Sequence, residues 1–192
     1  VKDYDSGRVL AAREPDARQE PASLTKLMAA YAVFKALAEG RIKLDGLVTI
    51  SESAWKQEGS RMFVQVGKQV PVEALIQGMI VQSGNDATVA LAEHVGGTEA
   101  TFVQMMNTYA KELGMTGSHF TNSAGMPDPE HYMTARDAAI LTVALIHEFP
   151  EYYKWYSQKE YTWNGITQQN RNGLLWRDPT VDGVKTGHTQ SA

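Results

Sequence analysis

Three short strings of residues along this chain carry side chains that together could catalyse acyl transfer. In order they are Ser23-Leu24-Thr25-Lys26, Ser83-Gly84-Asn85 and Lys185-Thr186-Gly187. Residues three apart in a helix share a face, so Lys26 is placed to take a proton from the Ser23 hydroxyl. Ser83 could pass a proton to a leaving amine, and Lys185 with Thr186 could donate to a substrate carboxylate. The strings supply a nucleophile, its base, a proton relay and a carboxylate clamp.

Each string by itself is a weak signal. Ser23 could cap a helix with Lys26 as a surface charge, and the other two strings could be a second cap and a solvated strand end. A second SxxK, Ser53-Ala54-Trp55-Lys56, lies in a polar segment without an apolar helix behind it, so we interpret it as a solvated turn. All three strings in this order are roughly a one-in-a-thousand accident. The combination therefore favours catalysis.

The first string begins a stretch that is apolar on nearly every face. Residues 23–39 predict a helix buried on all sides, with Ser23 at its N-terminus. There, unpaired N–H groups and the positive end of the helix dipole would favour a developing alkoxide. Burial and a nearby second cation, for which Lys185 is the candidate, would lower the pKa of Lys26. Lys26 could then be neutral part of the time, as a base must be.

The remaining periodicities predict a cluster of helices between early and late strands. Helices are expected over residues 72–82, 85–94, 99–113 and 135–147, and a turn or short helix over 51–56. Strands are expected within 1–10 and over 48–50, 159–163 and 180–185, the last an edge strand whose Gly187 leaves room for a substrate backbone. Residues 116–134 predict a long ordered loop. This pattern predicts an α+β fold with an antiparallel sheet.

Composition narrows the class of protein. With 192 residues, 43% of them hydrophobic, the chain can bury a sizeable core. The net charge of −4 argues against nucleic acid as a partner. There is no cysteine, the five histidines are scattered without a ligand spacing, and we predict no metal. The sequence contains no continuous apolar stretch of about 18 residues, so we predict no membrane-spanning helix.

Longer strings around the three motifs resemble one enzyme family. They are Pro21-Ala22-Ser23-Leu24-Thr25-Lys26-Leu27-Met28, Gln82-Ser83-Gly84-Asn85-Asp86-Ala87, Thr134-Ala135-Arg136-Asp137, Asn170-Arg171-Asn172-Gly173-Leu174-Leu175-Trp176 and Val181-Asp182-Gly183-Val184-Lys185-Thr186-Gly187-His188-Thr189. The sequence resembles the D-alanyl-D-alanine carboxypeptidases, low-molecular-mass penicillin-binding proteins of the penicillin-binding protein 5 type. The resemblance implies a β-lactamase/transpeptidase-like serine acyltransferase fold, with residues 1–192 as the penicillin-binding catalytic domain.

The resemblance also implies roles for individual residues. Ser23 would be the acyl-enzyme nucleophile, Lys26 its proton acceptor and Ser83 a second catalytic group. The backbone N–H groups of Ser23 and His188 would form an oxyanion hole. The residues expected to bind substrate are Asn85, Arg171, Lys185, Thr186, Gly187 and His188. The family needs no metal or cofactor, removes the terminal D-Ala from peptidoglycan stem peptides in the bacterial periplasm, and is acylated by β-lactams.

Some features depart from the family pattern. The chain stops soon after Gly187, so we expect an incomplete domain, without the remaining strands, the β-rich second domain or the C-terminal amphipathic anchor that would attach the enzyme to the inner membrane. Any export signal is likewise expected to lie outside it. Ala124 stands where family members often carry the His of a His-Gly-Leu string, and the loop at Gly59–Phe63 is one residue shorter. These departures concern substrate detail and deacylation.

Three alternatives remain open. A β-lactamase would need a general base, and Glu160 with Asn164 has the required spacing, although the alternating aromatics around Glu160 predict a strand. A penicillin-sensing or peptidoglycan-binding module could be acylated without turnover. An endopeptidase that cuts cross-links would use the same residues, and only the resemblance at 185–189 favours the carboxypeptidase.

Overall fold

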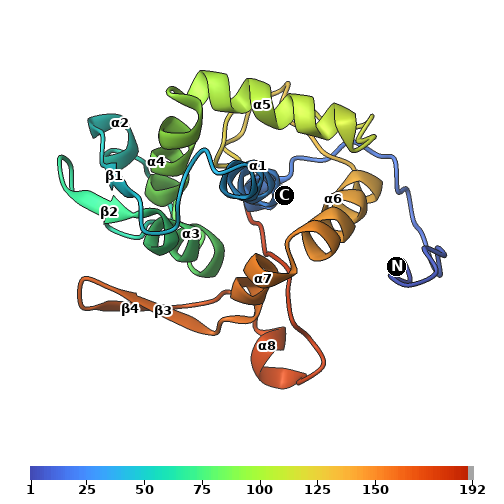
Figure 1. Cartoon of the computed structure of the whole chain (residues 1–192). Helices are drawn as coiled ribbons and strands as arrows, with labels where there is room; N and C mark the ends of the chain where they lie inside the picture. The colour runs from blue at the N-terminus through green and yellow to red at the C-terminus, as the bar shows by residue number, and fades with distance from the viewer. Residues whose placement is uncertain (190–192) are drawn as a thin grey trace.

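The computed structural model describes residues 1–189, and its longer helices surround one central helix (Figure 1). They are α1 (Thr25–Ala38), α2 (Glu52–Trp55), α3 (Val72–Val81), α4 (Asn85–Gly96), α5 (Glu99–Glu112), α6 (Ala135–Glu148), α7 (Pro150–Tyr153) and α8 (Leu174–Arg177). Two short 3-10 helices, η1 (Ala22–Leu24) and η2 (Lys154–Ser157), precede α1 and follow α7. None of the helices in this described part has the length and apolar character needed to cross a bilayer.

Helix α1 is the centre of the hydrophobic core. It contacts α3, α4, α5 and α6, and every residue from Leu27 to Phe34 is buried. The predicted all-round burial is confirmed, with one refinement at its start. Ser23 lies in the 3-10 helix η1, and the α-helix begins two residues later at Thr25. Burial on all sides leaves Lys26 little access to water.

The strands form two antiparallel hairpins. β1 (Leu47–Thr49) pairs with β2 (Gln69–Pro71), and β3 (Glu160–Trp163) pairs with β4 (Ile166–Gln169). Strand β4 was not expected, although Asn164-Gly165 is a strong two-residue hairpin signal, and both residues have positive φ in the structure. Helices with small antiparallel sheets agree with the predicted α+β class.

Two strand predictions were wrong in extent. Residues 1–10 reverse direction as expected, but they form only an isolated bridge between Lys2 and Val9. Residues 180–185 form no strand, since no strand within 1–189 pairs with them. A ladder needs a partner, and here the backbone is held by a side chain instead: Asn172 donates to the Gly183 carbonyl at 3.0 Å.

The predicted long loop over 116–134 is fixed to α5 and α6 by side chains. Asn107 accepts from the Phe120 N–H and donates to the Phe120 carbonyl. Glu99 accepts from both the N–H and the hydroxyl of Ser123, and Asp137 accepts from the Gly117 N–H. These contacts satisfy backbone groups that a loop would otherwise leave to water. The loop therefore reaches the cavity in a defined conformation.

Candidate active site

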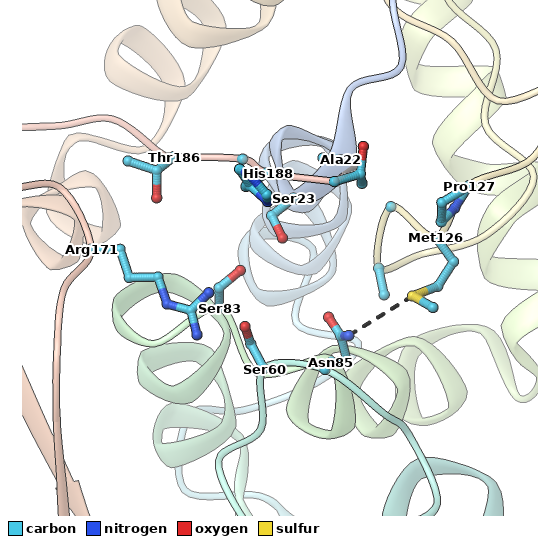
Figure 2. A pocket seen from close by; sticks show the side chains of 15 residues that line it. Ala22, Ser23, Ser60, Ser83, Asn85, Met126, Pro127, Arg171, Thr186 and His188 are labelled. Atoms are coloured by element: carbon cyan, nitrogen blue, oxygen red, sulfur yellow. Dashed lines mark hydrogen bonds between the residues drawn. The ribbon is translucent and has the colours of Figure 1, made fainter. Parts of the chain in front are cut away.

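A cavity of about 430 Å³ lies where the start of α1, the turn before α4, the loop over 116–134 and the segment after α8 meet (Figure 2). Its lining residues are Ala22, Ser23, Gly59, Ser60, Ser83, Asn85, Ala124, Gly125, Met126, Pro127, Arg171, Thr186, Gly187, His188 and Thr189. The side chains of Ser23, Ser83 and Arg171 point toward the same space in Figure 2. Residues from all three sequence motifs thus share one site.

The Lys26 amine lies behind the cavity, in contact with three acceptors. Its Nζ is 3.1 Å from Ser23 Oγ, 2.7 Å from Asn85 Oδ1 and 2.8 Å from the Ala124 carbonyl oxygen. Asn85 Oδ1 and the Ala124 carbonyl can only accept, whereas the serine hydroxyl can also donate. A neutral amine has two N–H groups for these two oxygens and one lone pair left for the Ser23 hydroxyl.

The electrostatics favour this neutral form. Burial lowers the pKa of Lys26 well below its usual value, and the charges of Lys185 and Arg171 lower it further, against the smaller opposing effect of Asp86. Only 2% of the Lys26 surface is exposed. The prediction that burial and a second cation act on this lysine is confirmed in direction, with Lys185 as the larger of two cationic contributions.

Asn85 is held so that its oxygen, not its nitrogen, faces Lys26. Its backbone N–H donates to the Ser60 carbonyl at 2.7 Å, and its Nδ2 donates to the Glu58 carbonyl at 2.7 Å. Because Nδ2 already has a carbonyl acceptor, Oδ1 is directed to the amine. Asn85 is the first residue of α4, so a helix fixes its backbone as well.

Ser83 lies in a strained turn between α3 and α4. Its φ is 61°, and its buried hydroxyl has no hydrogen-bond partner within residues 1–189. Leaving a buried polar group unpaired lowers the stability of the fold by about 1–3 kcal/mol. The Ser83 hydroxyl is therefore free to form a hydrogen bond with a ligand. Gly84 permits the turn because a Cβ there would lie 3.1 Å from the Met62 nitrogen and 3.2 Å from the Gly78 carbonyl.

Asp86 is a positioning residue that the sequence interpretation missed. Its buried carboxylate accepts from the backbone N–H groups of Met62, Phe63 and Val64 at 2.8, 2.8 and 3.1 Å. These contacts fix the loop whose carbonyls bind Asn85. A carboxylate in the first turn of α4, directly after the SxN string, was the available signal.

The nucleophile turn depends on Gly125. Ala22 has a φ of 49°, and Gly125 has a φ of 89° and lies against it. A Cβ on Gly125 would come within 1.8 Å of the Ala22 carbonyl oxygen, so no other residue fits without displacing the turn. The loop that supplies the Ala124 carbonyl therefore also supports the backbone before Ser23.

The opposite side of the cavity is formed by residues from 171 onward. Arg171, Thr186, Gly187 and His188 line it, and Figure 2 shows the Arg171 guanidinium directed toward Ser83. Gly187 makes room for a contact within the protein, because a Cβ there would lie 3.1 Å from the Pro21 carbonyl and 3.3 Å from the Ser23 nitrogen. The space predicted for a substrate backbone thus also admits a contact within the protein.

Lys185, predicted to donate to a substrate carboxylate, is half-buried next to the cavity-lining Thr186. It is not among the lining residues, and its Nζ donates to the Thr186 carbonyl at 2.9 Å. Burial, and then the Arg171 charge, lower its pKa to about 8. Lys185 acts on Lys26 as a nearby charge, and Arg171 is a second cation, one that lines the cavity.

Other candidates from the sequence lie away from this site. Lys56 of the second SxxK forms an exposed ion pair with Glu52. Glu160 is exposed on β3 and Asn164 is in the hairpin turn, and neither lines the cavity. No group of three or more potential metal ligands occurs among the described residues.

Comparison with known proteins gives one consistent result. A family model described as D-alanyl-D-alanine carboxypeptidase matches residues 1–192. The chain is 50% identical to the D-alanyl-D-alanine carboxypeptidase DacA of Haemophilus influenzae, covering all of this chain and 50% of that protein. It is 39% identical to the D-alanyl-D-alanine carboxypeptidase DacF of Bacillus subtilis, and the match covers 98% of this chain and 49% of that protein.

Solved structures agree with these relatives. Penicillin binding protein 5 from Haemophilus influenzae superposes with a TM-score of 0.97 at 50% identity, covering all of this chain and 57% of that one. The D-alanyl-D-alanine carboxypeptidase DacD from Francisella tularensis gives a TM-score of 0.97 at 36% identity, and the superposition covers 99% of this chain and 59% of that one. The chain spans about half the length of the curated relatives it matches.

Proposed function

The chain belongs to the D-alanyl-D-alanine carboxypeptidase family, and on that premise we propose that it removes the terminal D-Ala from peptidoglycan stem peptides through an acyl-enzyme on Ser23. The observation that carries the proposal is the arrangement around the buried Lys26 amine. Asn85 Oδ1 and the Ala124 carbonyl take its two N–H groups and leave its lone pair toward Ser23 Oγ. A buried neutral amine at hydrogen-bond distance from a serine is a competent general base.

The first half of the reaction forms the acyl-enzyme. Lys26 Nζ accepts the Ser23 proton as Oγ attacks the carbonyl carbon of the penultimate D-Ala. The resulting oxyanion is bound by the backbone N–H groups of Ser23 and His188, the predicted oxyanion hole. Ser83, whose hydroxyl is otherwise unpaired within residues 1–189, passes a proton to the departing D-Ala nitrogen as the C–N bond breaks. Ser83 regains a proton from the Lys26 ammonium, which leaves Lys26 neutral again.

The second half releases the shortened peptide. A water molecule attacks the ester carbon and gives a proton to Lys26 Nζ, and Lys26 returns this proton to the Ser23 oxygen as the ester C–O bond breaks, so that the free serine is restored. A β-lactam enters by the same attack, but its ring-opened product has no leaving group that diffuses away, so its ester persists. We propose β-lactams as covalent inhibitors on this ground.

Recognition of the substrate carboxylate is assigned chiefly to Arg171 and Thr186. Both line the cavity, and a guanidinium offers paired donors that match a carboxylate. Asn85, Gly187 and His188 complete the substrate contacts, and Lys185 contributes positive charge beside Thr186. Because stem peptides lie outside the inner membrane, we place the reaction in the bacterial periplasm, with a C-terminal anchor as a further prediction.

The test uses the full-length protein and a labelled penicillin. Intact mass and peptide mapping locate the adduct, and D-Ala release is measured on diacetyl-Lys-D-Ala-D-Ala. Ser23→Ala should abolish the adduct and D-Ala release. Ser53→Ala is the matched control, since it alters the second SxxK on the exposed surface, and it should leave both unchanged.

Each outcome separates the candidate functions. A stable adduct on Ser23 with D-Ala release supports the carboxypeptidase. An adduct without peptide turnover would instead identify a sensor or binding module. Rapid penicillin hydrolysis without an accumulating adduct would identify a β-lactamase. Cleavage of cross-linked dimers in preference to the pentapeptide analogue would identify an endopeptidase.

A further inference from the structure

A buried histidine connects the loop over 116–134 to the first turn of α1. His131 is 2% exposed and Thr25 is fully buried, and His131 Nε2 lies 2.7 Å from Thr25 Oγ1. The other ring nitrogen, Nδ1, accepts from the Thr121 backbone N–H at 2.9 Å. An acceptor nitrogen carries no proton, so the proton is on Nε2, and Nε2–H donates to the threonine hydroxyl.

The threonine lies between the two reacting side chains of the SxxK string. Thr25 is the first residue of α1, two residues after the nucleophile and one before the base. It also lies close to the loop, because a Cβ added to Gly125 would come within 3.0 Å of Thr25 Oγ1. The preceding residue, Ala124, provides the carbonyl that accepts from Lys26. The hydrogen bond between His131 and Thr25 therefore lies close to both the Ser23 turn and the Ala124 carbonyl, which contact Lys26.

His131 itself does not line the cavity. Its ring packs edge-on against Phe120, at 5.7 Å between centroids, and burial lowers its pKa to about 4. At neutral pH it is therefore uncharged, with one donor and one acceptor, as both of its contacts require. Nothing in the mechanism above uses this pair of residues.

We propose that His131 is a positioning residue for acylation: its two hydrogen bonds hold residues 121–125 against the start of α1, so that the Ala124 carbonyl and the Ser23 turn stay aligned on Lys26. This inference rests on the proposed function, since it concerns the geometry of the acylation step. The substrate carboxylate is bound on the opposite side of the cavity. Loss of the link should therefore slow acylation without weakening binding.

The experiment removes the acceptor and then restores it. Thr25→Val keeps the shape of the side chain but leaves His131 Nε2–H unpaired, whereas Thr25→Ser keeps the hydroxyl. Stopped-flow labelling of the full-length protein by a fluorescent penicillin separates the dissociation constant of the initial complex from the acylation rate constant. Thr25→Val should lower the rate constant by about 10- to 100-fold, as misplacement of reacting groups by about 1 Å does. The dissociation constant should change by less than about threefold, which is within about 0.7 kcal/mol.

The controls distinguish positioning from general destabilisation. Thr25→Ser should label within about threefold of the wild type. Thr142→Val removes a half-buried threonine hydroxyl that bonds Ala138 on α6, far from the nucleophile in the sequence, and it should label normally. His131→Asn keeps an acceptor for Thr121 but is too short to reach Thr25. Combined with Thr25→Val it should add little further loss, since both changes break one link.

Normal acylation by Thr25→Val, or a loss confined to the dissociation constant, would overturn the inference. Failure of the proposed function is distinguishable, because it shows in the wild type itself, either as no accumulating penicillin adduct or as an adduct without D-Ala release. The link is still testable in that case by amide hydrogen exchange of residues 120–126. Thr25→Val should lower their protection relative to Thr142→Val, and equal protection in the two variants contradicts the proposal.

Discussion

The two sides of the cavity are built on different principles. On one side Ser23, Lys26 and Asn85 lie at the starts of helices in the core, and Lys26 and Asn85 are hydrogen-bonded to each other and to backbone carbonyls. On the other side, Arg171 and His188 are exposed and the segment over 179–189 has no regular secondary structure. That segment is held by isolated contacts, such as that of Asn172 with Gly183.

The difference follows from what each side is proposed to do. Proton transfer from Ser23 requires a base whose pKa is lowered, and burial in a helical core is the largest cause of that lowering for Lys26. Carboxylate recognition requires a cation that stays charged, which Arg171 can do at an exposed position. The helical side should therefore control the acylation rate, and the irregular side should control binding.

The largest expected effect is on the helical side. Lys26→Ala removes the proton acceptor and should slow acylation by about 10³-fold, within the range for loss of a general base, with little change in binding. Stopped-flow labelling of the full-length protein measures both quantities. Lys35→Ala, which changes a partly exposed lysine on the same helix, is the control and should label normally. A Lys26 variant that labels at the wild-type rate would remove its assignment as base.

Arg171→Ala tests the irregular side. Loss of a charge-assisted contact with the carboxylate costs about 1.5–3 kcal/mol, which corresponds to about 10- to 150-fold in KM for the dipeptide-terminated substrate. The turnover number should fall much less. Arg177→Ala removes an exposed arginine at the end of α8 and controls for the change in net charge. A loss that appeared in kcat alone would mean that the two sides do not divide the work as argued.

A pH profile of acylation tests how the two sides interact. Lys185 belongs to the irregular side, and its charge acts on Lys26 of the helical side. Acylation should rise with pH as Lys26 loses its proton. The Lys185 charge lowers the pKa of Lys26, so Lys185→Met should move this rising limb to higher pH. Wild-type Lys185 loses its own charge near pH 8, so the two profiles should converge above that pH.

The control for this shift is Lys159→Met, which removes an exposed lysine before β3 and should leave the profile in place. A shift of the Lys185→Met limb to lower pH is the opposite sign and would show that Lys185 does not repel the Lys26 proton.

The smallest expected effect concerns how the irregular segment is held. Tyr153 donates to Asp182 Oδ1 at 3.2 Å, so Tyr153→Phe should lower the free energy of unfolding by about 1 kcal/mol. KM should rise by no more than about threefold. Tyr156→Phe is the matched control, because its buried hydroxyl has no partner within residues 1–189, and its removal should be neutral or stabilising. Chemical denaturation compares the two variants, and an equal loss in both would assign the effect to packing.

The fold was predictable where a local pattern decides it. The apolar run of α1 and the periodicities over residues 99–113 and 135–147 gave the bounds of α1, α5 and α6 within a few residues. The strand over 180–185 was wrong because its alternating pattern says nothing about whether a partner strand lies beside it. Of the β3–β4 hairpin only the first strand was predicted, although Asn164-Gly165 is a local signal for the turn that leads to the second.

The sequence by itself determined that Ser23 and Lys26 meet, since a spacing of three residues on a helix suffices for that. It also determined the family, through strings too specific to arise by chance. Only the tertiary structure decided the protonation state of the base. The Asn85 oxygen and the Ala124 carbonyl reach Lys26 from 59 and 98 residues away, and the pKa depends on burial among those distant segments. Desolvation and contacts between remote residues are properties of packing, which no local spacing specifies.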